Sequence, residues 1–204
     1  MPVTIGGNAI TGQGEIDSYV LAHVDLCLTL VNDLTVSPRQ GRDLASDQRI
    51  GTAFTDLALS ERLRGFALSD ADVDVLTDVA GRLRVAVDAC LGGDLHGAAT
   101  TLNGVLADHG AVPNLHASAD DTLVLAFHAV DATIVDAWAA ESAASLAFLV
   151  GTRQTHRLGR CDAEACDAYF LDVTKNASRR FCSLACQNRA KSAAYRQKRR
   201  VKMS

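Results

Sequence analysis

Aromatic side chains are scarce in this sequence: only 5% of the 204 residues are Phe, Trp or Tyr. Proteins that bind single-stranded nucleic acid stack bases on exposed aromatic rings, so this scarcity argues against a large stacking surface. Proline is rare too, with three in the chain, while hydrophobic residues make up 48%. A chain with this composition and few helix breakers is expected to fold into a mostly helical, soluble protein.

Long apolar runs, export signals and catalytic motifs are also missing. The most apolar stretch, 122–150, is interrupted by Asp131, Asp136 and Glu141, which predicts that no segment spans a membrane. The N-terminus has no basic residues followed by an apolar run, so we expect a cytoplasmic protein. The histidines are scattered, and no zinc-hydrolase, nucleophile-elbow, phosphate-loop or redox motif occurs. We therefore expect that the protein is not an enzyme.

Lysine is absent from the first 152 residues, and charge is divided unequally along the chain. Residues 153–204 contain 13 lysines and arginines against four acids, whereas the other 152 residues contain seven bases and 20 acids. The formal net charge of −4 conceals this split. A basic segment on an acidic body predicts a polyanion-binding tail. The alternative is a solvated tail that only aids solubility.

Four of the six cysteines lie close together in the basic segment. Cys161 and Cys166 form one pair, and Cys182 and Cys186 form the other. Two close pairs separated by a loop supply four thiolates to a tetrahedral zinc ion, so the spacing predicts a structural Zn²⁺ site with these ligands and no open position. Two disulfides or four free thiols are the alternatives, and disulfides would need an oxidising compartment.

The residues around these cysteines predict a small module over 156–204. Residues 169–173 have strand character, 174–178 predict a turn, and 179–181 are expected to return as a second short strand. Cys182 and Cys186 are then expected in the first turn of a helix, with Ser183 as its N-cap. Because such a hairpin has little apolar surface, we expect the module to need its metal to fold.

Several motifs in this module resemble the CGNR-type zinc finger. They are Arg160-Cys161, Cys166, Phe170-Leu171-Asp172, Asn176, Ser178-Arg179-Arg180-Phe181-Cys182 and Cys186-Gln187-Asn188-Arg189-Ala190-Lys191. Gln187 stands where the family has its glycine. The resemblance implies a treble-clef-like finger that follows an ABATE domain, in bacterial proteins regarded as stress-induced transcription regulators. Leu30-Val31-Asn32-Asp33-Leu34 resembles a signature near the start of ABATE domains.

The helix after the fourth cysteine is predicted to be basic on two flanks. At 100° per residue, arginines 189, 196 and 200 share one stripe and lysines 191, 198 and 202 share another, with alanines 190 and 194 and Val201 between them as the expected packing side. Arginine can bond guanine edges in a bidentate way, whereas lysine mainly supplies charge to phosphates. The candidate nucleic-acid-binding residues are Arg179, Arg180, Asn188, Arg189, Lys191, Arg196, Lys198, Arg199 and Arg200. Two of these have structural alternatives: a hydrogen bond within the finger for Asn188, and an ion pair with Asp172 for Arg180.

Residues 1–152 predict a helical domain with a small hairpin. Cys27, Cys90 and His23 fall on apolar helix faces and are expected to pack in the core. A capping box at 69–72 opens one helix, and Gly92-Gly93 ends it. The other expected elements are helices over 14–34, 94–107 and 131–151, one or two short helices within 43–64, a loop over 35–41, and strands over 111–116 and 122–127.

Together these features predict a mainly α protein with two domains. Residues 1–152 form the helical domain, and residues 156–204 form a four-cysteine zinc finger ending in a basic helix. The expected function is duplex DNA binding and transcriptional control, with the first domain sensing a small-molecule effector or forming a homodimer. An RNA- or protein-binding finger is the main alternative. An enzyme with a ligand pocket in the helical domain is a further one.

Overall fold

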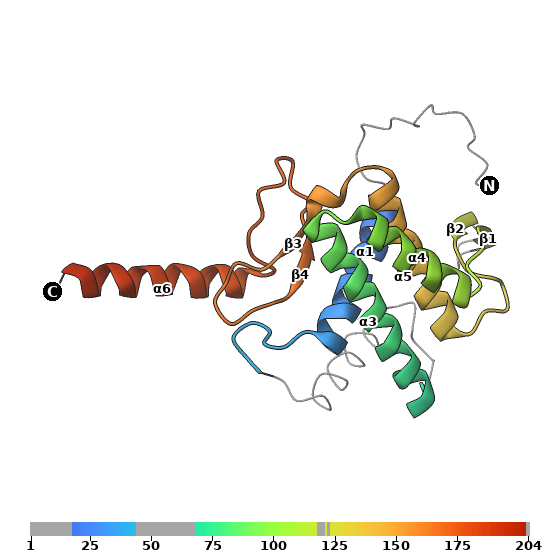
Figure 1. The fold of residues 1–204 in the computed structure, drawn as a ribbon, viewed down its shortest axis with the longest axis horizontal. Helices are drawn as coiled ribbons and strands as arrows, with labels where there is room; N and C mark the ends of the chain where they lie inside the picture. The colour runs from blue at the N-terminus through green and yellow to red at the C-terminus, as the bar shows by residue number, and fades with distance from the viewer. Residues whose placement is uncertain (1–17, 44–67, 118–120, 122, 203–204) are drawn as a thin grey trace.

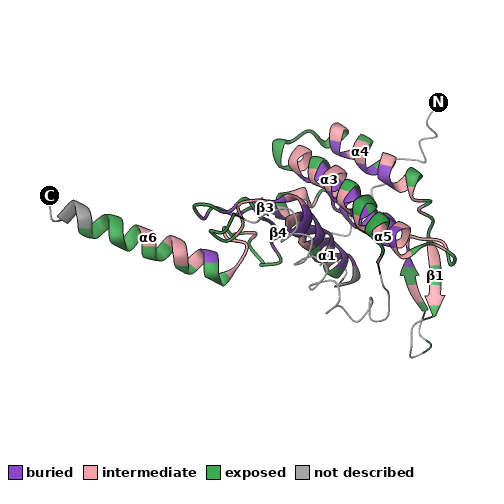
Figure 2. Cartoon of the chain, turned by 90° about the horizontal axis from the view of Figure 1, so that it is seen from below, coloured by how far each residue is buried: buried purple, intermediate pink, exposed green. Residues whose placement is uncertain are grey.

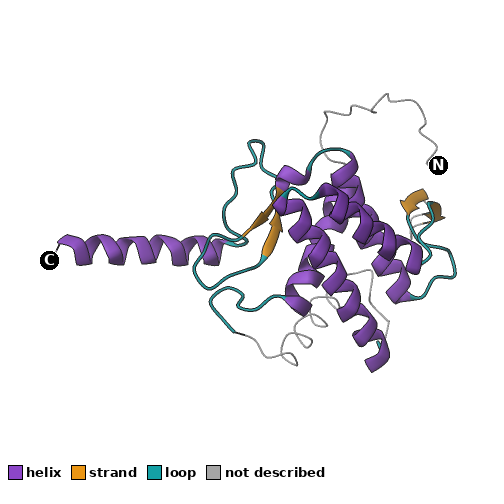
Figure 3. Cartoon of the chain, in the orientation of Figure 1, coloured by secondary structure: helices purple, strands orange, loops and turns teal. Residues whose placement is uncertain are grey.

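The computed structural model describes residues 18–43, 68–117, 121 and 123–202, and this part of the chain is mainly helical (Figure 3). The short helices predicted within 43–64 lie almost entirely outside the described residues. The helices are α1 (Ser18–Thr35), α3 (Asp70–Gly92), α4 (Leu95–Asp108), α5 (Ile134–Gly151) and α6 (Leu184–Lys202), and the strands are β1 (Asn114–Ala117), β2 (Leu123–Ala126), β3 (Leu158–Arg160) and β4 (Tyr169–Leu171).

Local signals in the sequence place the helix ends. The Ser69 side chain accepts a hydrogen bond from the Asp72 amide while the Asp72 carboxylate accepts one from the Ser69 amide, so the predicted capping box is confirmed. At the other end of α3, Gly93 has a φ of 81°, a left-handed conformation that glycine adopts without strain. The N-cap of α5 is Thr133, whose hydroxyl accepts from the Asp136 amide.

Helix α5 lies at the centre of the helical body. It packs against α1, α3 and α4, and alanine and serine occupy most of its buried positions, which lets neighbouring backbones approach closely. Its length and composition would suffice to cross a membrane, but 56% of the helix is buried inside the body. The apolar character of α5 is therefore explained by its place in the core. His23 and Cys27 are buried as predicted, and Cys90 packs against the same core.

Two antiparallel hairpins lie in different parts of the molecule. Strands β1 and β2 pair with Leu115 opposite Leu125, which confirms the hairpin predicted in the helical domain. This hairpin lies at one end of the molecule, and α6 extends from the other end (Figures 1 and 2). The second hairpin, β3–β4, lies between α6 and the helical body (Figure 1).

The hairpin of the cysteine-rich segment differs from the prediction. Strand β4 pairs with β3, with Gly159 opposite Phe170, and not with residues 179–181. The reason is Asp172, whose carboxylate accepts hydrogen bonds from the Thr174 and Arg179 amides at 2.8 and 2.5 Å. These bonds close 172–179 into a loop of its own, so the chain does not return along β4.

The β3–β4 hairpin also shares the core of the helical body. Leu158, Tyr169 and Leu171 are buried in one cluster with residues of α1, α3, α4 and α5. Tyr169 is 2% exposed, and it is among the largest fully buried side chains. The apolar surface of the hairpin is thus covered by the helices, where the sequence predicted a thin core stabilised by metal alone.

Helix α6 leaves the body after its first turns. In Figure 2 the exposed colour covers most of its length, and residues 194–199 are all exposed. The prediction that Ala194 lies on a packing side is wrong, since it is exposed. Ala190 is half-buried, and the Val201 side chain lies outside the described residues.

Candidate metal centre

Four cysteine side chains from distant parts of the segment converge at one point. The Sγ atoms of Cys161, Cys166, Cys182 and Cys186 all lie within 4.8 Å of one another. Cys182 Sγ lies 3.7 Å from Cys166 Sγ and 3.6 Å from Cys186 Sγ. Zn–S bonds of about 2.3 Å in a tetrahedron place sulfurs roughly 3.8 Å apart, so this cluster fits a zinc ion.

The pKa values of these thiols show what a bound cation would have to overcome. Burial and the neighbouring cysteines raise the pKa of Cys182, and burial raises the pKa of Cys161. Without a cation, these thiols resist forming the buried thiolates that a metal site requires. A divalent ion would reverse this balance, because it stabilises all four thiolates at once.

Backbone amides already point at several of the sulfurs. Cys161 Sγ accepts a hydrogen bond from the Cys182 amide at 3.4 Å, and Cys166 Sγ accepts one from the Gln40 amide at 3.3 Å. Burial opposes ionisation of Cys166, but the amides of Gln40 and Ala168 bring its pKa below the usual value. Such donors orient metal ligands and stabilise their charge.

The second cysteine pair flanks the start of α6. Ser183 Oγ accepts a hydrogen bond from the Cys186 amide at 3.2 Å, which confirms Ser183 as the N-cap. Cys186 lies in the first turn as predicted, whereas the prediction that Cys182 also lies there is wrong, because Cys182 comes just before the cap. Gln187 continues the helix through a bond from its amide to the Ser183 carbonyl at 3.1 Å. Glutamine therefore fits where the resembling family has glycine, since the position needs no positive φ.

A loop of the helical body holds the first cysteine pair, a role that the sequence does not predict. Residues 38–41 follow α1 and form three hydrogen bonds with residues 165–167. The Gly41 amide donates to the Ala165 carbonyl at 2.8 Å, the Asp167 amide donates to the Pro38 carbonyl at 3.0 Å, and the Gln40 amide donates to Cys166 Sγ. Gly41 has a φ of 79°, and a Cβ there would lie 3.0 Å from the Arg189 guanidinium. The predicted loop over 35–41 gave no local sign that it meets a segment over 120 residues away.

A second anchor joins α1 and α3 to strand β4. The Asn32 side chain donates to the Tyr169 carbonyl at 2.9 Å and accepts from its amide at 2.8 Å. The Tyr169 hydroxyl donates to Asp88 on α3 at 2.7 Å, and Arg160 donates to the same carboxylate at 2.6 Å. Two helices thus fix the position of the strand that follows Cys166.

Three of the predicted nucleic-acid-binding arginines have partners inside the module. The Arg179 guanidinium donates to the carbonyls of Leu171, Phe181 and Cys182 and lies 4.8 Å from the centroid of the Phe170 ring. Arg180 pairs with Asp162 at 2.8 Å, so its structural alternative, an ion pair with Asp172, named the wrong partner. Arg189 donates to Glu164 O at 2.9 Å and lies 3.6 Å from Cys186 Sγ.

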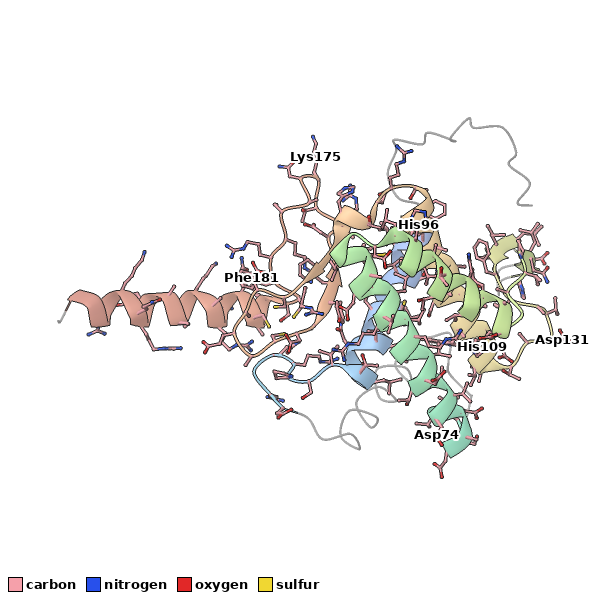
Figure 4. The ribbon with its side chains drawn as sticks, in the orientation of Figure 1. Asp74, His96, His109, Asp131, Lys175 and Phe181 are labelled. Atoms are coloured by element: carbon pink, nitrogen blue, oxygen red, sulfur yellow. The ribbon has the colours of Figure 1, made fainter. Side chains whose placement is uncertain are left out.

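Five of the remaining predicted residues lie exposed on α6. Asn188, Lys191, Arg196, Lys198 and Arg199 are exposed. The side-chain amide of Asn188 has no hydrogen-bond partner within the part of the chain that the structure describes. The alternative prediction, a structural hydrogen bond within the finger, therefore finds no support there. The Arg200 side chain lies outside the described residues. Figure 4 shows Phe181 at the base of α6 and Lys175 on the separate loop after β4.

Comparison with known proteins supports the metal centre. Residues 157–199 match the model of the CGNR zinc finger family. A search of curated proteins found no match to the chain. The matched range contains all four cysteines of the cluster, so a zinc finger is present in this protein and the bound ion is expected to be zinc.

Proposed function

We propose that the protein is a cytoplasmic, zinc-dependent transcription regulator that binds duplex DNA through α6. The ABATE-like part of the resemblance belongs to this proposal, with residues 18–151 as the regulatory body. The observation that carries the proposal is α6 itself. It has seven basic residues and no acidic one, and beyond its first turns it is exposed to solvent.

The dimensions and charge of α6 suit a DNA groove. A helix of this length is about 28 Å long, and the major groove of B-form DNA admits an α-helix. The deep, narrow major groove of duplex RNA does not admit side chains in this way, which favours DNA. Because Arg179, Arg180 and Arg189 have partners within the finger, the DNA-facing set that we propose is Asn188, Lys191, Arg196, Lys198 and Arg199.

The proposal is tested by the salt dependence of binding. Fluorescence anisotropy would follow the zinc-loaded protein on a labelled duplex at several salt concentrations. Each phosphate contact contributes about 0.9 to the slope of log K against log salt, so Arg196→Ala with Arg199→Ala should lower the slope by roughly 1.8. Lys175→Ala removes one exposed charge from another loop and should leave the slope unchanged.

Two further arms distinguish the alternatives. Removal of zinc by a chelator should abolish DNA binding if the finger orients α6. Unlabelled duplex RNA and polyglutamate would compete with the labelled DNA. Stronger displacement by either one than by unlabelled duplex DNA, or a slope that the double substitution leaves unchanged, would contradict the proposal.

A further inference from the structure

A pocket lies at the end of the helical body opposite to α6. Its volume is about 310 Å³, and β2, α5 and the first turn of α1 form its walls. This is the size of a small-molecule site, for which volumes of about 300–1,000 Å³ are typical. The residues that matter for its chemistry are Val20, Leu125, Phe127, Glu141, Ser145 and Phe148.

One carboxylate gives this apolar pocket a polar end. The Glu141 side chain is 14% exposed, and no lysine or arginine is among the residues that line the pocket. Its Oε1 accepts a hydrogen bond from the Phe127 amide at 2.7 Å. Burying a carboxylate among apolar side chains is costly, and packing alone would be served by an apolar residue.

Imidazole rings surround the same carboxylate. His23 Nε2 lies 3.8 Å from Glu141 Oε2, and His128 Nε2 lies 3.8 Å from Oε1. The His116 ring follows, with its centroid 4.5 Å from that of His128. The one ionisable residue that lines the pocket thus lies next to further titratable side chains, and such clusters are enriched at binding sites.

We propose that this pocket binds a small hydrophobic amine. The ammonium group would lie at the Glu141 carboxylate, and the apolar body would lie against Val20 and Leu125. Phe127 and Phe148 contribute aromatic rings, whose faces attract cations. Charge complementarity selects the cation, because Glu141 is the one charged side chain among the described residues that line the pocket.

The position of the pocket suits an effector site. Helix α1 carries Val20 at the pocket, and near its other end it carries Asn32, which bonds strand β4 of the finger. A bound amine would therefore contact the helix that anchors the finger. The proposal stands whether or not α6 binds DNA, since it rests on the pocket alone.

Titration calorimetry with three aromatic probes of similar size but different charge tests the charge preference. The full, zinc-loaded protein would be titrated with benzylammonium, benzyl alcohol and benzoate. We expect saturable binding of benzylammonium, at least tenfold weaker binding of benzyl alcohol, and none of benzoate. Glu141→Gln keeps an acceptor for the Phe127 amide and should weaken benzylammonium at least tenfold, to the level of the alcohol. Asp74→Asn, on the exposed face of α3, should change nothing.

A second variant tests the location. Ala144 lines the pocket, and Ala144→Phe should fill it and abolish binding of benzylammonium while circular dichroism and zinc content stay at the wild-type level. The proposal would be overturned by wild-type protein that shows no saturable binding of benzylammonium, or by binding that survives both pocket variants. It would equally be overturned if sedimentation showed a dimer that Ala144→Phe dissociates, since the pocket would then be an interface between copies.

Discussion

Asp136, at the first turn of α5, shows what a single side chain contributes. Its carboxylate accepts a hydrogen bond from the Thr133 hydroxyl at 2.7 Å and lies 2.8 Å from Nδ1 of His109, which follows the end of α4. The Thr133 hydroxyl and His109 together hold the pKa of Asp136 below its usual value. One residue thus ties the start of α5 to the end of α4 while the carboxylate is ionised.

The pH dependence of stability should reveal this contribution. Because the pKa of Asp136 is lower in the folded protein than in the unfolded chain, its stabilisation is present above the unfolded value of about 3.9 and is lost as the pH falls through the folded value. Asp136→Asn should therefore lower the free energy of unfolding at pH 6 by about 1 kcal/mol, a modest amount because the side chain is partly exposed.

Urea denaturation at pH 6 and at pH 3 measures this difference. Both proteins are compared at each pH, so any acid-induced loss of metal affects them equally. The difference should be smaller at pH 3 than at pH 6. Asp131→Asn is the matched control, because Asp131 is exposed just before α5 and should not change stability (Figure 4). A difference between wild type and Asp136→Asn that persists undiminished in acid would contradict the assignment.

At this scale, the sequence predicts the metal ligands but not their supports. The spacing of the cysteines is enough to predict the four thiolate ligands, because two close pairs can reach one metal ion. Gln40 is separated from Cys166 by 126 positions, and no local pattern marks an amide that donates to a distant sulfur. Arg179 and Arg189 count only as charges in the sequence, whereas their partners include main-chain carbonyls that the fold brings to them.

At the scale of elements, α6 is a helix that few tertiary contacts support. Alanine, arginine, lysine and glutamine are good helix formers, Ser183 caps the N-terminus, and basic residues near the C-terminus complement the helix dipole. Like charges four apart, at 196 and 200 and at 198 and 202, oppose these effects. The sequence predicts this helix correctly because its signals are local. Its packing side was not predictable, since periodicity does not say whether a partner element exists.

The helicity of α6 should therefore respond to charge. Arg196→Glu replaces a repulsive pair with an attractive one toward Arg200, worth about 0.2–0.5 kcal/mol, and should raise ellipticity at 222 nm in low salt. Ser192→Glu adds a similar pair toward Arg196 without removing a base, so it should raise helicity while it preserves more of the DNA affinity. Added salt should raise wild-type helicity by screening repulsion. Equal spectra for all three proteins in low salt would refute this account.

At the scale of the molecule, the helical body and the finger share a core. The sequence divides cleanly in charge near residue 153, and that division predicts two domains. The distribution of charged residues indicates which segments face solvent. It does not indicate which apolar side chains pack against one another. Leu158, Tyr169 and Leu171 enter the same cluster as Val24 and Leu83 of the helices. The loop over 38–41 and Asn32 then add hydrogen bonds across the same junction.

Zinc should consequently stabilise the helical body as well as the finger. The single tryptophan, Trp138, is buried in a second core cluster with residues of α1 and α3, separate from the cluster of the four cysteines, so its fluorescence reports unfolding of the body. Chelation of zinc, or Cys182→Ser, should loosen β4 and lower the urea midpoint seen by Trp138. Asn32→Ala removes both bonds to the Tyr169 backbone and should lower the midpoint of the zinc-loaded protein by itself, at a cost of about 1–3 kcal/mol.

The effects of zinc removal and of Asn32→Ala on the urea midpoint should not be additive. If the metal acts on the body through the β3–β4 hairpin, chelation should shift the midpoint less in Asn32→Ala than in wild type, because part of the connection is already missing. Thr29→Ala is a matched control on α1. Among the residues that the structure describes, the Thr29 hydroxyl bonds only the Asp25 carbonyl of the same helix, so this change should leave the zinc-dependent shift intact. An unchanged Trp138 transition after complete removal of zinc would show that the stability of the helical body does not depend on the metal centre and that the shared core does not connect the two.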